Sequence, residues 1–169
     1  MEIIIRDALP EDLPRILEIV NHAILHTTAN YSYEPQTLQM QRQWFLDKQK
    51  HGFPVIVAAC ENQVVGYGAY GTFRQKIGYQ YTVEHSVYVL ENHYGKGIGR
   101  QLMLELIRRA RAQNLHVMIG AIDAANAESI AFHKTLGFTE SGVIRQAGFK
   151  FGKWLDLLFM QLILSPASR

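Results

Sequence analysis

A single glutamate, Glu84, stands inside a run rich in β-branched residues, Val83 to Leu90, and a glycine-rich segment, Gly95 to Gly99, follows soon after. β-Branched residues favour a strand, and glycine lets the backbone turn its N–H groups inward. A strand that delivers a carboxylate beside a loop of free N–H groups could both remove a proton and hold a phosphate. The spacing therefore indicates an enzyme that uses a phosphate-bearing cofactor.

The glycine segment differs from the two commonest nucleotide-binding loops. Arg100 stands where the dinucleotide fingerprint needs its third glycine, and no Gly-Lys-Ser/Thr sequence ends the segment as in a P-loop. What is left is a strand, a loop with three alternate glycines and a helix, in which backbone N–H groups and the helix dipole can face one anion. A glycine-rich start of a helix without a ligand is the alternative interpretation.

Glu84 is expected on the more polar face of its strand. Successive side chains alternate between faces, so Val83, Val87 and Val89 mark a core face and Glu84 lies on the other. A half-buried carboxylate has its pKa raised toward the range of a general base. A structural ion pair, for instance with Arg74, is the alternative.

Two further side chains could take part in chemistry. The guanidinium of Arg74 suits a carboxylate partner, although a surface arginine has no need of one. His133 lies on an expected helix, where a lone histidine is more often structural than catalytic. The histidines show no metal-ligand spacing, so no metal is expected, and no G-x-S-x-G serine motif is present.

Composition narrows the class of protein. The 169 residues are 48% hydrophobic and 19% charged, as in an ordinary globular domain. A net charge of +2 gives no argument for binding nucleic acid or a membrane surface. The one cysteine, Cys60, is expected to be a buried thiol in a strand. No signal peptide is expected, and no apolar run approaches the ~20 residues that a membrane-spanning helix needs. A reducing cytoplasm fits these features.

The expected elements describe one α/β domain over residues 1–169, with a mixed central sheet and helices on both faces. Strands are predicted at 2–6, 54–60, 64–71, 79–90, 116–122, 138–146 and 153–163. Helices are predicted from Pro10, from a cap at Thr37 to Lys50, from the glycine segment to Gln113, and from about Ala125 to a glycine cap at Gly137.

Together these residues resemble the GNAT N-acetyltransferases. The phosphate loop of that superfamily, Arg/Gln-x-x-Gly-x-Gly/Ala, is matched by Tyr94 to Gly99 except that Tyr94 replaces Arg or Gln, and Asn126 to Phe138 looks like its second cofactor segment. Thr82–Val89 and Phe149–Asp156 more closely resemble the phosphinothricin/methionine sulfoximine acetyltransferase group. The loops at Thr27–Ala29 and Phe73–Arg74 also fit that group.

The resemblance implies a GNAT fold, with a mixed, mostly antiparallel sheet of about seven strands. It implies acetyl transfer from acetyl-CoA to the α-amino group of a small amino acid or analogue, usually by a homodimer with sites near the subunit interface. Detoxification of such analogues is the associated role. No nucleic acid, membrane or metal partner is implied.

Site residues follow from the resemblance by position. Glu84 becomes the general base and His133 the proton donor to the leaving thiolate. Residues expected to contact the acceptor are Phe73, Arg74, Gln75, Val83, Glu84 and His85, with Arg74 holding its carboxylate. Residues expected to contact acetyl-CoA are Ser86, Val87, Tyr88, Gly95, Lys96, Gly97, Ile98, Gly99, Arg100 and Asn126.

The acceptor is the open part of this hypothesis. Phe73 stands where close relatives often have tryptophan, and Gln75 where they often have proline, so the acceptor pocket differs from theirs. An ordinary amino acid, aromatic or acidic, a polyamine or a protein N-terminus are alternative acceptors. A CoA-binding sensor without catalysis is an alternative of another class. Transfer is expected to be direct, because Cys60 lies away from the motifs.

Overall fold

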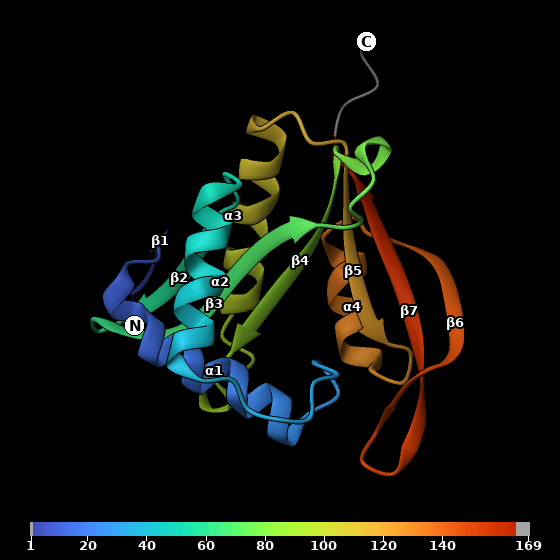
Figure 1. Cartoon of the computed structure of the whole chain (residues 1–169), viewed down its shortest axis with the longest axis horizontal. Coiled ribbons are helices and arrows are strands. Elements are labelled where there is room, and N and C mark those ends of the chain that lie inside the picture. The colour runs from blue at the N-terminus through green and yellow to red at the C-terminus, as the bar shows by residue number, and fades with distance from the viewer. Residues whose placement is uncertain (1, 165–169) are drawn as a thin grey trace.

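A computed structural model describes residues 2–164, which form one seven-stranded sheet and four α-helices (Figure 1). The strands are β1 (Ile3–Asp7), β2 (Val55–Cys60), β3 (Gln63–Thr72), β4 (Thr82–Val89), β5 (Val117–Asp123), β6 (Thr139–Lys150) and β7 (Lys153–Ile163). The helices are α1 (Leu13–His26), α2 (Leu38–Lys50), α3 (Ile98–Ala112) and α4 (Ala127–Thr135). The strand order is β1-β2-β3-β4-β5-β7-β6, which confirms the predicted mixed fold.

Local signals in the sequence explain where the helices begin and end. The Thr37 hydroxyl accepts a hydrogen bond from Met40 N at the start of α2, as its place in the sequence predicted. At the end of α4, Gly137 adopts a φ of 92°, a left-handed conformation that glycine reaches without strain.

The strand predicted from residue 79 begins only at Thr82. Residues Ile77–Tyr79 form a 3-10 turn, in which Gln80 N donates to Ile77 O at 3.1 Å. The strand predicted to end at residue 146 continues to Lys150, because β6 and β7 pair up to their hairpin turn. The 3-10 turn before β4 and the irregularity of β6 between Ile144 and Gly148, where Gln146 has a φ of 54°, both break the two-residue side-chain period, so pattern alone misplaced both boundaries.

Helices cover the two faces of the sheet with separate cores. Buried residues of α1 and α2 pack on one face around Val57, Tyr67 and Ala69. The other face packs α3 against Ile56, Ala58 and Met118, with partly buried residues of α4 added to this core. We call these the α2 face and the α3 face.

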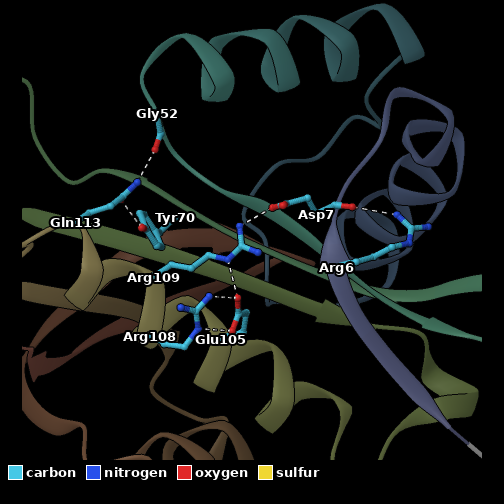
Figure 2. A network of polar contacts seen from close by, with 8 residues as sticks. All are labelled: Arg6, Asp7, Gly52, Tyr70, Glu105, Arg108, Arg109 and Gln113. Atoms are coloured by element: carbon cyan, nitrogen blue, oxygen red, sulfur yellow. Dashed lines mark hydrogen bonds and ion pairs between the residues drawn. The ribbon is translucent and has the colours of Figure 1, made fainter.

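A polar network fastens α3 to the strands beside it (Figure 2). Arg109 donates to Glu105 on its own helix and to Asp7 of β1, at 2.8 and 2.5 Å. Gln113 accepts a hydrogen bond from the Tyr70 hydroxyl and donates to Gly52 O. The network holds Tyr70 of β3 from the α3 face.

The sheet opens between β4 and β5. Within residues 2–164 these strands are the one parallel pair, and they pair only from Thr82–Val117 to Glu84–Ile119. Beyond Glu84 the two strands diverge, while β5 continues beside β7 as far as Asp123 (Figure 1). The backbone of β4 after Glu84 is therefore left without β5 as a partner, which provides the place for a ligand.

The described residues 2–164 include no helix that is both long and apolar enough to cross a membrane. In the same part of the chain, no three or more His, Cys, Asp or Glu side chains are grouped so that they could hold a metal ion.

Candidate active site

A cleft of about 630 Å³ lies where β4 and β5 part, on the side of α3 and α4. This volume is within the ordinary range for small-molecule sites. Its walls are β4, the glycine loop, the start of α3, the face of α4 and the loop after α1. The predicted cofactor residues that line it are Val87, Tyr88, Gly95, Gly97, Ile98, Gly99, Arg100 and Asn126.

The glycine loop has the geometry of an anion cradle. Gly95 and Gly97 take φ values of 74° and 77°, and a Cβ at either position would meet no atom within 4 Å, so their backbones face open space. The first helical hydrogen bond of α3 runs from Gln101 N to Gly97 O. The N–H groups of Ile98, Gly99 and Arg100 therefore have no carbonyl within the helix, as expected for the first turn. They fit a phosphate group.

Two predicted cofactor residues lie elsewhere. The Lys96 side chain turns back to donate to Asn92 O at 3.1 Å and does not line the cleft. Ser86 lines a smaller cavity on the α2 face. Tyr88 lines both that cavity and the cleft, so the two spaces adjoin at this residue. Asn126 caps α4 by accepting from Ser129 N at 3.1 Å, which leaves its amide NH₂ free to donate.

Glu84 occupies the last position at which β4 pairs with β5. Its half-buried carboxylate lines the small cavity, of about 130 Å³, on the α2 face. The alternative ion pair with Arg74 is not formed: Glu84 takes part in none of the ion pairs found over residues 2–164. Burial raises the pKa of Glu84, and the nearby positive charge of Lys48 partly offsets the rise.

His133 is buried against a second histidine. Its Nδ1 lies 2.7 Å from Ser129 O, and its Nε2 lies 3.0 Å from Nε2 of His85. A carbonyl only accepts, so Nδ1 of His133 carries a proton. Burial lowers the pKa of both histidines, that of His85 to about 3, and each therefore favours the neutral form. In that form, Nε2 of His133 accepts a hydrogen bond from His85.

The predicted acceptor residues separate into three groups. Glu84 faces the small cavity, and Gln75 lines a neighbouring open groove together with Lys48 and Gly71. Val83 and His85 point to the α3 face, where Val83 is buried in the core. Consecutive strand residues cannot share a face, so at most the backbone of these two could meet an acceptor beside Glu84.

Phe73 and Arg74 form an edge of this region. The Phe73 ring packs edge-on against Tyr79 and Phe159. Arg74 is exposed, with its guanidinium 5.6 Å from the centre of the Phe73 ring, and its side chain lines neither cavity. Its predicted part in holding a carboxylate stays a prediction.

Lys48 lines both the small cavity and the adjoining groove but was not among the site residues predicted from the sequence. One lysine on an amphipathic helix carries no local signal of a role. Ser129 and Phe132 line the cleft and were not predicted either, because nothing in the local sequence marks them as site residues. The loop Thr27–Ala29, noted in the resemblance, does form part of the cleft wall.

Residues 16–138 match the Acetyltransferase (GNAT) family, which is more than half of the chain. The chain belongs to the GNAT acetyltransferase family. It is therefore an acetyltransferase, as the resemblance of its motifs implied.

Relatives within the GNAT family resemble the chain over most of its length. It is 50% identical to a L-methionine sulfoximine/L-methionine sulfone acetyltransferase of Pseudomonas aeruginosa, over 96% of this chain and 95% of the relative. It is 35% identical to a phosphinothricin N-acetyltransferase of Streptomyces viridochromogenes, over 93% and 85%. The solved structure of a putative acetyltransferase of Salmonella typhimurium with its cofactor acetyl-CoA superposes with a TM-score of 0.95, at 44% identity, over 98% and 96% of the two chains.

Proposed function

We propose that this GNAT enzyme transfers an acetyl group from acetyl-CoA to the α-amino group of a small amino acid or analogue, of the methionine sulfone, methionine sulfoximine or phosphinothricin type. The observation that carries the proposal is the unpaired carboxylate of Glu84 where β4 and β5 part, which lines the small cavity on the α2 face, next to the large cleft that Tyr88 also lines. The names of the relatives support the acceptor class. Detoxification in the cytoplasm is the role that we propose with it.

The cleft fits acetyl-CoA, which would supply an acetyl group activated as a thioester. The unpaired N–H groups at the start of α3, with Gly95 and Gly97, would hold its pyrophosphate. The amide NH₂ of Asn126 would donate to the pantetheine arm. Backbone groups of β4 near Val87, which lack β5 as a partner, would polarise the thioester carbonyl.

Glu84 would act on the acceptor. An α-amino group is protonated near neutral pH and must lose a proton before it can attack a thioester. Glu84 can take that proton directly or through water, because its carboxylate is unpaired and faces a cavity. Burial raises the pKa of this carboxyl group, which makes it a better base than an exposed glutamate.

His133 would act on the leaving sulfur, on the α3 face. The resemblance makes it the proton donor. Because its Nδ1–H is bonded to Ser129 O, only Nε2 could deliver a proton to the thiolate. In the neutral form Nε2 carries no proton, so it would first have to take one up from water and exchange its hydrogen bond with His85 for one to the sulfur.

The decisive experiment replaces the carboxylate of Glu84. Glu84→Gln should keep the affinity for acetyl-CoA and lose turnover by roughly 10²-fold or more, the size expected for a general base. In the unchanged enzyme kcat/KM should fall as pH falls through the raised pKa of Glu84, since the protonated carboxyl group cannot accept a proton. Calorimetry with acetyl-CoA would measure the affinity, and a thiol-release assay with methionine sulfone would measure turnover and kcat/KM.

The matched control is Glu61→Gln, which removes an exposed carboxylate in the turn between β2 and β3. It should change neither the affinity for acetyl-CoA nor the turnover. Near-normal turnover of Glu84→Gln would remove Glu84 as the base. A protein that binds acetyl-CoA but acetylates no amine would favour the non-catalytic sensor.

A further inference from the structure

Lys48 holds a fixed positive charge on the α2 face of the sheet. Its Nζ donates to Tyr70 O at 3.0 Å, from the last turn of α2. The ammonium also lies 5.6 Å from the centre of the Phe53 ring and 6.0 Å from that of Trp44. The side chain is half-buried, unlike that of Lys50 two residues later, which is exposed. Tyr70 is itself held from the α3 face, where its hydroxyl donates to Gln113.

The absence of a side chain at residue 71 brings this charge close to Glu84. Gly71 of β3 stands opposite Glu84 of β4 in the register of the sheet. A Cβ built on Gly71 would lie 2.3 Å from Lys48 Nζ, so the ammonium occupies the space that a side chain at 71 would fill. Side chains directly opposite each other on paired strands share a face, with Cβ atoms about 5 Å apart. Lys48 therefore takes the place of the cross-strand neighbour of Glu84.

The two charges nevertheless form no ion pair. Over residues 2–164 neither Lys48 nor Glu84 appears among the contacts of 4.0 Å or less between opposite charges. They influence each other across a gap: Lys48 offsets the rise that burial causes in the pKa of Glu84, and Glu84 offsets the fall in that of Lys48.

The gap is a polar space with unused hydrogen-bonding groups. Lys48 and Glu84 both line the cavity of about 130 Å³. Of the three N–H donors of Lys48, one is bonded to Tyr70 O. Gln41, which is only 2% exposed and lines the same cavity, has a side-chain oxygen with no hydrogen-bond partner in the described structure. A buried unpaired acceptor is costly, which points to a ligand or water that donates to it.

We propose that Lys48 and Glu84 together bind the charged head of a free α-amino acid, Glu84 receiving the α-ammonium and Lys48 the α-carboxylate. The inference rests on the proposed function and narrows its acceptor to zwitterions. A zwitterion carries its opposite charges one carbon apart and is complementary to two fixed opposite charges that do not neutralise each other. A polyamine or a peptide N-terminus has no carboxylate beside its amine to meet Lys48. The carboxylate is thereby assigned to Lys48 rather than to the exposed Arg74.

The experiment compares methionine sulfone with its carboxamide, which has the amine and side chain but no carboxylate. Lys48→Met should raise KM for the acid ten-fold or more, as expected for losing a charge-assisted hydrogen bond, and leave KM for the amide nearly unchanged. Lys50→Met, on the same helix, is the matched control and should alter neither. Lys48→Arg keeps the charge and a donor for Tyr70 O, so it should retain the preference for the acid. If Lys48→Arg keeps this preference and Lys48→Met still acetylates the amide normally, the higher KM of Lys48→Met for the acid does not come from misfolding.

The outcomes separate this inference from the function on which it rests. An equal loss for acid and amide in Lys48→Met would overturn the assignment, and so would a preference abolished by Arg74→Ala but kept in Lys48→Met. Either result leaves acetyl transfer intact. A wild-type enzyme that acetylates neither probe would overturn the proposed function and this inference with it.

Discussion

Glu84 and His133, the two side chains expected to move protons, lie on opposite faces of β4. Glu84 faces α2, whereas His133 meets His85, the next residue of the strand, on the α3 face. Gly120 of β5 makes room for this pair, since a Cβ there would lie 2.9 Å from His85 Nε2 and 3.1 Å from His133 Nε2. Reagents bound on the two faces can meet only through the opening where β4 and β5 diverge.

The hydrogen bonds of the histidine pair predict its tautomers. At pH 7–8, which is above the ordinary histidine pKa and therefore above the lowered pKa values of both rings, His133 should carry its proton on Nδ1 and His85 on Nε2. Nitrogen-15 NMR of the imidazole rings, assigned with a His85→Asn variant, would measure this. A proton on Nε2 of His133 would contradict the geometry and support the role of proton donor.

The glycine loop and α3 form one anion-binding element. Left-handed glycines turn the chain at Gly95 and Gly97, and the helix then begins with free N–H groups. Gly99 differs from them, because a Cβ there would make only ordinary contacts of 3.7 Å or more with Phe132 and Val89. Of the three alternate glycines, Gly95 and Gly97 are therefore the two whose left-handed backbone conformation requires glycine.

Gly95→Ala should weaken acetyl-CoA binding by roughly ten-fold, because the strained residue disturbs the cradle. The same left-handed strain arises in Gly52→Ala, at a φ of 70° beyond the end of α2 and outside the cleft. Each substitution should lower the free energy of unfolding by about 1 kcal/mol. Calorimetry and denaturant titration would compare the two, and equal acetyl-CoA affinities would show that the loop does not hold the cofactor.

At the scale of the whole molecule, the β6–β7 hairpin is exposed at the edge of the sheet. Its outward apolar side chains are Val143, Ile144, Phe149, Phe151, Trp154 and Ile163. Trp154 is 63% exposed, and within residues 2–164 no strand pairs with the outer edge of β6, which is twelve residues long. Such a surface favours association, which supports the homodimer that the resemblance implies.

We expect a particle of twice 19.3 kDa in solution. Trp154→Glu should convert it to a monomer, since a charge would have to be buried in the interface. Leu46→Glu places the same charge on α2, at a residue 57% exposed, and should leave the dimer intact. Sedimentation equilibrium measures the mass, and a monomeric wild-type protein at micromolar concentration would refute the expectation.

Much of the fold was predictable because its signals are local. Alternation along β4 identified the valine face and the opposite place of Glu84, and the cap residues Thr37 and Gly137 marked helix ends. The strand boundaries near residues 79 and 146 were wrong, because a 3-10 turn before β4 and a bulge within β6 interrupt the side-chain period. Local pattern says which residues form an element and says less about where pairing stops.

By itself, the sequence determined that this chain carries a carboxylate on a strand before a glycine loop, and hence its family. Tertiary structure alone decided which side chains surround that carboxylate. Lys48 reaches the place opposite Glu84 through the packing of α2 and the missing side chain of Gly71, and His85 meets His133 through the packing of α4 and the space at Gly120. These pairings depend on how distant segments pack together, which no local spacing encodes.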